Sequence, residues 1–256
     1  MHRNQVSIAL AQVPVRDSDV QYNLKQHILA IQQAAEHGAD LVVFPELSLT
    51  GYDLANASAN ALDKRSDEIR QLSELVVAKQ IIAMVGCPVK NPVGKPYISM
   101  AICLPTGEVE FYSKQYLHAG EESHVSSGLS NGFLRLNGYK LALSICADFS
   151  EPEHAKDAHD AEADLYISSA LISPNGYESD SAILSTMAQR YQMPVMLANH
   201  IGQTGGWDTA GKSAMWDQNG EQVACANNQQ TQLLICQIEG TLVESKSIEL
   251  QLEGAQ

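Results

Sequence analysis

Short apolar segments alternate with amphipathic segments along the whole chain, and this alternation constrains the fold more than any other feature. Residues 7–11, 41–44 and 165–168 are examples of the apolar segments. Continuous apolar runs of this length are typical of strands that are buried on both faces. Residues 20–37 instead repeat apolar side chains at helical spacing. Such an alternation predicts an α/β fold with buried sheets.

The same patterns give the bounds of the expected elements. The expected strands cover residues 7–11, 41–44, 81–86, 97–104, 108–112, 140–145, 165–168, 195–198, 213–216, 222–226 and 232–237. The expected helices cover residues 20–37, 66–79, 151–161 and 179–192. Asp19 and Gly38 are residue types that cap the two ends of the first helix. Patterning alone leaves open whether the strands form one doubly wound sheet or two stacked sheets.

The charge and the cysteine content exclude several classes of protein. The chain carries a net charge of −14, whereas nucleic acids and anionic membrane surfaces attract basic patches, so we expect neither as a partner. Five cysteines without a Cys-x-x-Cys pair argue against a disulfide framework and against a zinc site. No segment is long enough to span a membrane, and the N-terminus lacks a secretory pattern. The sequence therefore predicts a cytoplasmic protein without a metal site.

Cys146 stands at the end of one expected strand, residues 140–145. A helix is expected to begin close behind it, and the unpaired backbone N–H groups at a helix start lower the pKa of a thiol. Cys146 is therefore a candidate nucleophile. The alternative is an inert core cysteine, which is what we expect of the other four, Cys87, Cys103, Cys225 and Cys236.

Two charged residues occupy comparable positions. Glu46 follows the apolar run 41–44, and Lys114 follows the expected hairpin of residues 97–112. Either residue alone would be interpreted as a loop acid or a surface lysine. A Glu, a Lys and a Cys in this order, each after a strand, instead combine a proton acceptor, a cation and a nucleophile.

The surroundings of these three residues resemble the motifs of the nitrilase superfamily of carbon–nitrogen hydrolases. The motifs are met by Phe44-Pro45-Glu46 with Thr50-Gly51-Tyr52, by Lys114 with Leu117, and by Cys146 with Asp148, Pro152 and Glu153. Residues 6–12 and 211–220 also look like segments of the family, so the resemblance covers essentially the whole chain. It implies a single carbon–nitrogen hydrolase domain over residues 1–256, folded as a four-layer α-β-β-α sandwich. It also implies a homodimer or a larger homo-oligomer, paired through the outer helices.

The resemblance further implies a reaction that needs no cofactor. Cys146 would attack a small amide and form a thioester, while Glu46 takes the thiol proton and passes it to the departing amine. Lys114 would stabilise the oxyanion together with the backbone N–H of Ala147, and its charge would lower the thiol pKa. We therefore expect a small amide or carbamoyl amine as substrate, with ammonia or an amine as product.

A second carboxylate belongs to the implied site. The family's further glutamate stands seven residues before a glycine, so Gly128 selects Glu121 over Glu122. Its implied role is to orient Lys114 and the leaving group of the substrate. Tyr52 is a candidate for substrate binding. The sequence leaves open which of four further side chains reach the pocket: His118, His124, Trp207 and Arg190.

Two departures from the family pattern bear on the substrate. Many amidases and carbamoylases carry an aromatic residue directly after the cysteine and an arginine four residues after it, whereas this chain has Ala147 and Ser150 there. An arginine would pair with a carboxylate of the substrate. Its absence favours a substrate with a neutral or cationic tail, and so does the excess of expected site acids over Lys114, namely Glu46, Glu121, Glu122 and Asp148.

Three alternative functions share these features. A true nitrilase and an amide acyltransferase would use the same nucleophile, acid–base group and cation. A non-catalytic scaffold could retain the sandwich without turning over a substrate. The intact set of Glu46, Lys114 and Cys146 argues against the scaffold.

Overall fold

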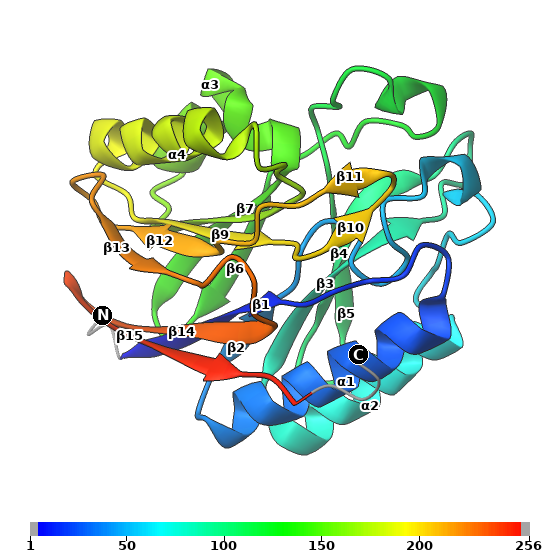
Figure 1. The fold of residues 1–256 in the computed structure, drawn as a ribbon, viewed down its shortest axis with the longest axis horizontal. Coiled ribbons are helices and arrows are strands. Elements are labelled where there is room, and N and C mark those ends of the chain that lie inside the picture. The colour runs from blue at the N-terminus through cyan, green and yellow to red at the C-terminus, as the bar shows by residue number, and fades with distance from the viewer. Residues whose placement is uncertain (1–4, 252–256) are drawn as a thin grey trace.

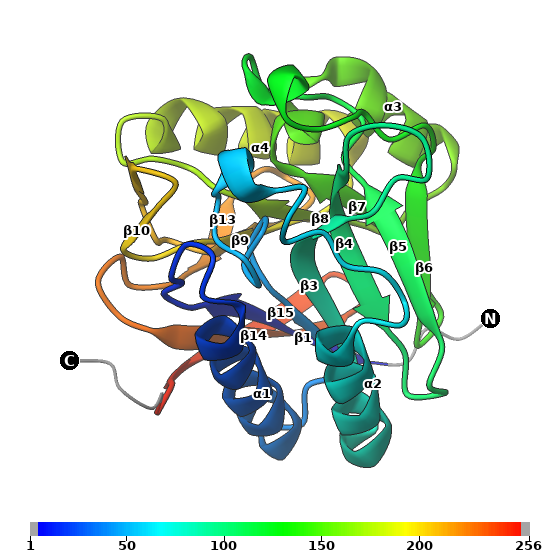
Figure 2. The ribbon, with the colours of Figure 1, turned by 90° about the vertical axis from the view of Figure 1, so that its right-hand side faces the viewer.

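Two β-sheets stack face to face in this protein, and helices cover the outer face of each (Figure 1). The structure, a computed structural model, describes residues 5–251. In the side view of Figure 2, α1 (Val20–Glu36) and α2 (Asp67–Lys79) lie on one side, while α3 (Pro152–Asp160) and α4 (Tyr177–Tyr191) lie on the other. The expected four-layer α-β-β-α sandwich is confirmed, and the choice that patterning left open is decided in favour of two stacked sheets.

The first sheet is the one that α1 and α2 cover. Its strands are, in spatial order, β15 (Leu242–Glu249), β14 (Gln232–Glu239), β1 (Val6–Gln12), β2 (Leu41–Val43), β3 (Ile82–Val89), β4 (Tyr97–Cys103) and β5 (Val109–Ser113). The central strands β1, β2 and β3 run parallel, with Ile8 beside Leu41 and Leu41 beside Ile82. The helices α1 and α2 are the crossover connections that parallel strands need.

The second sheet is covered by α3 and α4. Its strands are, in spatial order, β13 (Gln222–Cys225), β12 (Ala214–Trp216), β9 (Val195–Asn199), β8 (Leu165–Ala170), β7 (Tyr139–Ile145) and β6 (Gly132–Leu136). Here β7, β8 and β9 run parallel. The remaining elements are short: the hairpin of β10 (Gln203–Thr204) and β11 (Trp207–Asp208), and the 3₁₀ helices η1 (Leu54–Asn56), η2 (Glu121–Ser123) and η3 (Cys146–Ser150).

The layering explains why the central strands are mostly apolar on both of their faces. In β1, Ile8 belongs to the core between the sheets, whereas Ala9 belongs to the core that includes α1 and α2. In β8, Ile167 faces the other sheet and Tyr166 faces α3 and α4. Because successive side chains point to opposite faces and both faces are covered, most positions along these strands favour apolar residues.

The helix caps and most of the expected elements are confirmed. The Asp19 carboxylate accepts a hydrogen bond from the backbone N–H of Tyr22 at 3.1 Å, and Gly38 has a φ of 78° just after α1. Four strands were not expected: β6, β15 and the two-residue strands β10 and β11. β15 is largely exposed and polar, β6 is only partly buried, and β10 and β11 are very short, so none has the continuous apolar pattern of a central strand.

The cysteine expectation needs one correction. Cys87, Cys103 and Cys236 are buried, but Cys225 is exposed on β13, the edge strand of the second sheet. An edge strand has a neighbour on one side only, so its side chains reach solvent more readily. Within residues 5–251, no helix combines the length and the apolar character that crossing a membrane requires.

Candidate active site

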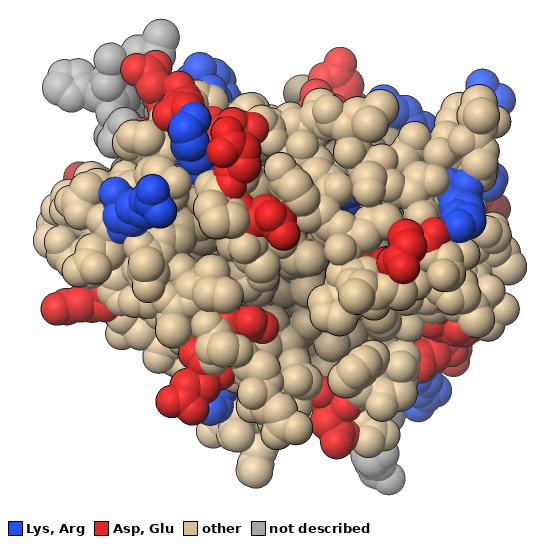
Figure 3. All heavy atoms as spheres, turned by 90° about the horizontal axis from the view of Figure 1, so that it is seen from above, with Lys and Arg blue, Asp and Glu red and all other residues tan. Residues whose placement is uncertain are grey.

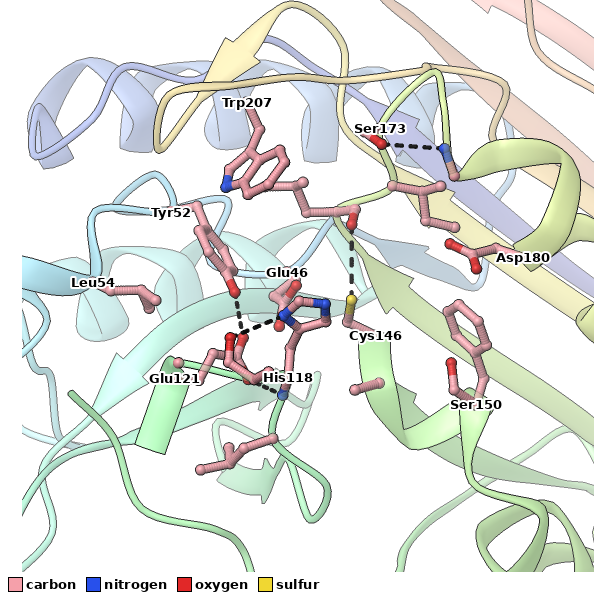
Figure 4. A pocket seen from close by; sticks show the side chains of 18 of the residues that line it. Glu46, Tyr52, Leu54, His118, Glu121, Cys146, Ser150, Ser173, Asp180 and Trp207 are labelled. Carbon is pink, nitrogen blue, oxygen red and sulfur yellow. Dashed lines mark hydrogen bonds between the residues drawn. The ribbon is translucent and has the colours of Figure 1, made fainter. Parts of the chain in front are cut away.

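Glu46, Lys114 and Cys146 meet where strands of the two sheets end. Glu46 follows β2 and Lys114 follows β5, both in the first sheet, whereas Cys146 follows β7 in the second. Glu46 and Cys146 line a cavity of about 810 Å³, with Glu121, Tyr52 and Ala147 also on its wall (Figure 4). Stacking the two sheets therefore joins residues that are far apart in the sequence.

A buried cluster of charges forms one wall of this cavity. The ammonium of Lys114 donates to Oε1 of Glu46 at 2.7 Å and to Oε1 of Glu121 at 2.8 Å. All three side chains are almost completely removed from solvent. Removing Lys114 would leave the two buried carboxylates without a compensating charge, which is strongly destabilising.

Glu121 is held from several sides. The hydroxyl of Tyr52 donates to its Oε1, and the backbone N–H of His118 donates to its Oε2 at 2.7 Å. Glu122, by contrast, is exposed and accepts a hydrogen bond from the backbone N–H of Gly120 at 2.7 Å. The structure thus places Glu121 in the cluster and Glu122 outside the cavity.

Gly128 packs directly against the segment that carries Lys114. Its N–H donates to the carbonyl of Lys114 at 2.6 Å, and a Cβ at this position would lie 2.2 Å from the carbonyl oxygen of Ser113. A larger residue could not fit without displacing this backbone. Close packing against the backbone of Ser113 therefore explains why a glycine stands seven residues after Glu121.

Cys146 adopts an unusual backbone conformation at the turn from β7 into η3. Its φ is 46°, in the left-handed region that non-glycine residues rarely occupy. The thiol Sγ donates to the carbonyl of Leu171 at 3.8 Å. Strain of this kind persists where the surrounding structure fixes the residue, and it is concentrated at functional sites. Ala147 follows within the first turn of η3, where backbone N–H groups lack acceptors inside the helix.

Asp148 does not face the cavity, although the sequence led us to count its charge among those of the site. It is fully buried, and its Oδ1 accepts from the backbone N–H groups of Gln115 and Tyr116 at 3.0 and 2.9 Å. Its Oδ2 accepts from the N–H of Ile145 at 2.9 Å and from the hydroxyl of Tyr112 at 2.7 Å. Asp148 therefore ties the turn that carries Cys146 to the segment just after Lys114.

Burial and the neighbouring charges shift the pKa values of Glu46 and Lys114. Burial, opposed by Lys114 and reinforced by the neighbouring Glu121, raises the pKa of Glu46 to about 7. Burial alone would lower the pKa of Lys114, but the negative charges of Glu46 and Glu121 outweigh it and raise that pKa. Lys114 is therefore cationic at neutral pH, while Glu46 is poised to exchange a proton.

Lys114 lowers the pKa of the Cys146 thiol, as expected, but the net shift of that pKa is upward. Burial raises the pKa of Cys146 and the charge of Glu46 raises it further, while Lys114 acts in the opposite direction without compensating. The resting site therefore holds a neutral thiol beside an ionisable carboxylate. Oε2 of Glu46 is buried and has no hydrogen-bond partner among the described residues, so it is free to accept a proton.

The structure also answers which further side chains reach the cavity. His118, His124 and Trp207 line it, and Ser150 does so as well. Arg190 is not among the described lining residues, and its guanidinium lies 5.4 Å from the ring centre of Tyr191. Sequence reasoning missed Ser173, in the loop between β8 and α4, and Asp180, in α4, because no motif marks them.

The sequence pattern of the carbon-nitrogen hydrolase family matches residues 7–246. The chain therefore belongs to this family, within the nitrilase superfamily. It is an enzyme of the class that hydrolyses carbon–nitrogen bonds.

Relatives of known activity include amidases. An (R)-stereoselective amidase of Pseudomonas sp. is 28% identical over 199 residues, which cover 77% of this chain and 72% of that protein. A formamidase of Pseudomonas syringae pv. syringae is 24% identical over 262 residues, which cover 98% of this chain and 77% of that protein.

Solved structures show the same fold. The amidase of Nesterenkonia sp. AN1 has a TM-score of 0.82 and 26% identity, with 90% of this chain and 91% of that chain covered. A mutant of that amidase shows covalent addition of the acetamide moiety of fluoroacetamide at its active-site cysteine, with a TM-score of 0.83, 25% identity and coverage of 91% and 90%.

Proposed function

We propose that this protein is a cysteine-dependent hydrolase that cleaves a small non-peptide amide or carbamoyl amine through a thioester and releases ammonia or an amine. One observation carries the proposal: a thiol and a carboxylate with a free oxygen share one cavity wall, and a buried ammonium donates to that carboxylate from behind the wall. The cysteine adduct in the Nesterenkonia amidase supports the same role for Cys146. The roles assigned below are part of the proposal.

The first step forms a bond between Sγ of Cys146 and the carbonyl carbon of the amide. The raised pKa of the thiol disfavours a free thiolate, so proton transfer to Oε2 of Glu46 accompanies the attack. The electron pair of the carbonyl π bond moves to oxygen. Lys114 and the N–H of Ala147 stabilise the resulting oxyanion, and losing one such donor typically costs about 3 kcal/mol.

The second step breaks the carbon–nitrogen bond. Glu46 returns its proton to the departing nitrogen, which leaves as ammonia or an amine, and the acyl group remains on sulfur as a thioester. Water then attacks the thioester while Glu46 accepts a proton from it. Collapse of this second intermediate releases the acid and restores the thiol of Cys146.

Glu121 acts through Lys114 in this scheme. Its 2.8 Å hydrogen bond gives the ammonium a second carboxylate partner besides Glu46, and its second oxygen is held by the backbone of His118. Tyr52 both lines the cavity and donates to Glu121. We therefore assign Glu121 and Tyr52 to positioning, with Tyr52 also in reach of the substrate.

The substrate tail is proposed to be neutral or cationic. Ser150 lines the cavity at the position where relatives carry an arginine. Among the described lining residues, none is Lys or Arg, and Lys114 itself is completely buried behind the wall. A carboxylate tail would therefore find no partner for its charge.

Ammonia release from a panel of short amides, carbamoyl amines and nitriles tests this function. We expect release from amides or carbamoyl amines, and a hydroxamate when hydroxylamine competes with water for the thioester. Mass spectrometry of the peptide that contains Cys146 should then show the acyl group. Release only from nitriles would favour a nitrilase, and transfer without hydrolysis would favour an acyltransferase. No turnover of any member would favour the scaffold.

We also propose that the protein forms a homodimer or a larger homo-oligomer through its outer helices. On α4, for example, Ile183 is a large apolar residue that is 39% exposed to solvent. Light scattering after size-exclusion chromatography should give a mass of at least two chains. The mass of one chain at micromolar concentration would contradict the proposal.

A further inference from the structure

Asp180 is an acidic side chain on the cavity wall that the proposed reaction does not use. It is partly buried and lies in the first turn of α4, the helix that covers the second sheet. Glu46 and Lys114, by contrast, follow strands of the first sheet. Figure 4 shows its carboxylate directed into the cavity, on the same side as Cys146 and Ser150. A substrate that reaches Cys146 can therefore also contact Asp180.

The carboxylate of Asp180 lies near the segment that contacts the thiol. A Cβ on Gly176 would lie 3.5 Å from Oδ2 of Asp180 and 3.5 Å from Oγ of Ser173, so these two oxygens flank the same small residue. The same segment supplies the carbonyl of Leu171, which accepts from Sγ of Cys146. Asp180 is thus near the thiol side of the cavity.

The carboxylate of Asp180 lacks a counterion. Within residues 5–251, its side chain makes no hydrogen bond and no ion pair, and burial raises its pKa with only a partial opposing effect from His118. The carboxylates of Glu46 and Glu121 differ, because Lys114 neutralises part of their charge. A partly desolvated anion without a partner favours a cationic ligand.

The charges on the surrounding surface also favour a cationic ligand. The view from above in Figure 3 shows a hollow near the centre of this face, with Asp and Glu side chains more numerous around it than Lys and Arg. Glu151 is exposed on the cavity wall, and Trp207 presents an indole, whose face attracts cations. An ammonium that enters the cavity therefore meets no repelling lysine or arginine among the described lining residues.

We propose that Asp180 binds an ammonium group on the tail of the substrate, so that the preferred substrates are aminoalkyl amides or aminoalkyl carbamoyl compounds. The inference rests on the proposed hydrolase function and narrows its substrate from a neutral or cationic tail to a cationic one. The cavity of about 810 Å³ is larger than a short amide needs, which leaves room for an alkyl chain between Cys146 and Asp180.

Binding to the Cys146→Ala variant tests the inference without requiring turnover. The matched ligands are δ-aminovaleramide and hexanamide, which differ by an ammonium in place of a methyl group. Calorimetry should show the aminoalkyl amide binding at least about tenfold more tightly. Adding Asp180→Asn should reduce this ratio to within about twofold. The control Glu178→Gln removes the same charge from an exposed position of the same helix turn and should leave the ratio unchanged.

Two results would overturn the inference: equal binding of the two amides, including no measurable binding of either, or a preference that survives Asp180→Asn. A different result would contradict the hydrolase proposal. If the wild type released no ammonia from either amide while the preference and its loss in Asp180→Asn were observed, the ammonium site would stand and the catalytic assignment would be wrong.

Discussion

The two oxygens of the Glu46 side chain have different surroundings, and this difference defines its proposed role. Oε1 accepts from Lys114 at 2.7 Å, whereas Oε2 is buried without a partner among the described residues. One oxygen is therefore fixed and the other can take a proton from Cys146. The pKa of about 7 lets Glu46 both accept and return that proton near neutral pH.

This pKa predicts the pH dependence of catalysis. Below pH 7 Glu46 is largely protonated and cannot take the thiol proton, so kcat/KM for a neutral amide should rise as the pH increases through about 7. The profile should be measured between about pH 5 and pH 9 with hexanamide, which has no titrating group. A kcat/KM that is constant across this range would contradict the assignment of Glu46.

Glu46→Gln and Lys114→Ala should each reduce kcat by at least about 10²-fold. Their effects should be strongly non-additive, because both groups act on the same tetrahedral intermediate. Steady-state kinetics of the two single variants and the double variant provide the comparison. Losses that multiply in the double variant would show that the two residues do not work as a unit.

At the scale of elements, Asp148 links the two segments that carry the reacting groups. Its oxygens accept four hydrogen bonds, from the segment after Lys114, from the strand before Cys146 and from Tyr112. An asparagine could not accept all four, because its amide nitrogen is a donor. The link explains why an acid two residues after the cysteine is useful without touching the substrate.

We therefore expect Asp148→Asn to destabilise the fold by about 1–3 kcal/mol and to lower kcat more than it raises KM. Denaturant unfolding and steady-state kinetics measure the two effects. The control is Glu122→Gln, an exposed acid outside the cavity, which should change stability by less than about 0.5 kcal/mol. An Asp148→Asn protein with the stability and kcat of the wild type would contradict the linking role.

The elements also show what sequence patterning can and cannot predict. Central strands such as β1 and β8 were predictable, because burial on both faces favours apolar residues at most positions. The strands β6 and β15 were not, because β6 is only partly buried and β15 is largely exposed and polar, so neither carries a continuous apolar run. The sequence also led us to count Asp148 among the acids of the site, which was wrong. The direction of a side chain in a tight 3₁₀ turn depends on contacts that are distant in the sequence.

At the scale of the whole molecule, stacking the two sheets creates the site. The ordered motifs around Glu46, Lys114 and Cys146 were sufficient to predict which side chains meet, since each follows a strand. Motifs could not predict the pKa of Cys146, because it reflects a balance between burial and three neighbouring charges. Nor could they reveal Asp180, which reaches the cavity only through the packing of α4 on the second sheet.

The most direct test of the catalytic account is the turnover of the Cys146→Ala variant, measured as ammonia release from a short amide that the wild type hydrolyses. The account predicts less than about one per cent of wild-type kcat, because loss of a nucleophile normally costs several orders of magnitude. Circular dichroism and thermal unfolding should show that the variant keeps the wild-type fold. Turnover above that level in the folded variant would contradict the role of Cys146 as the nucleophile.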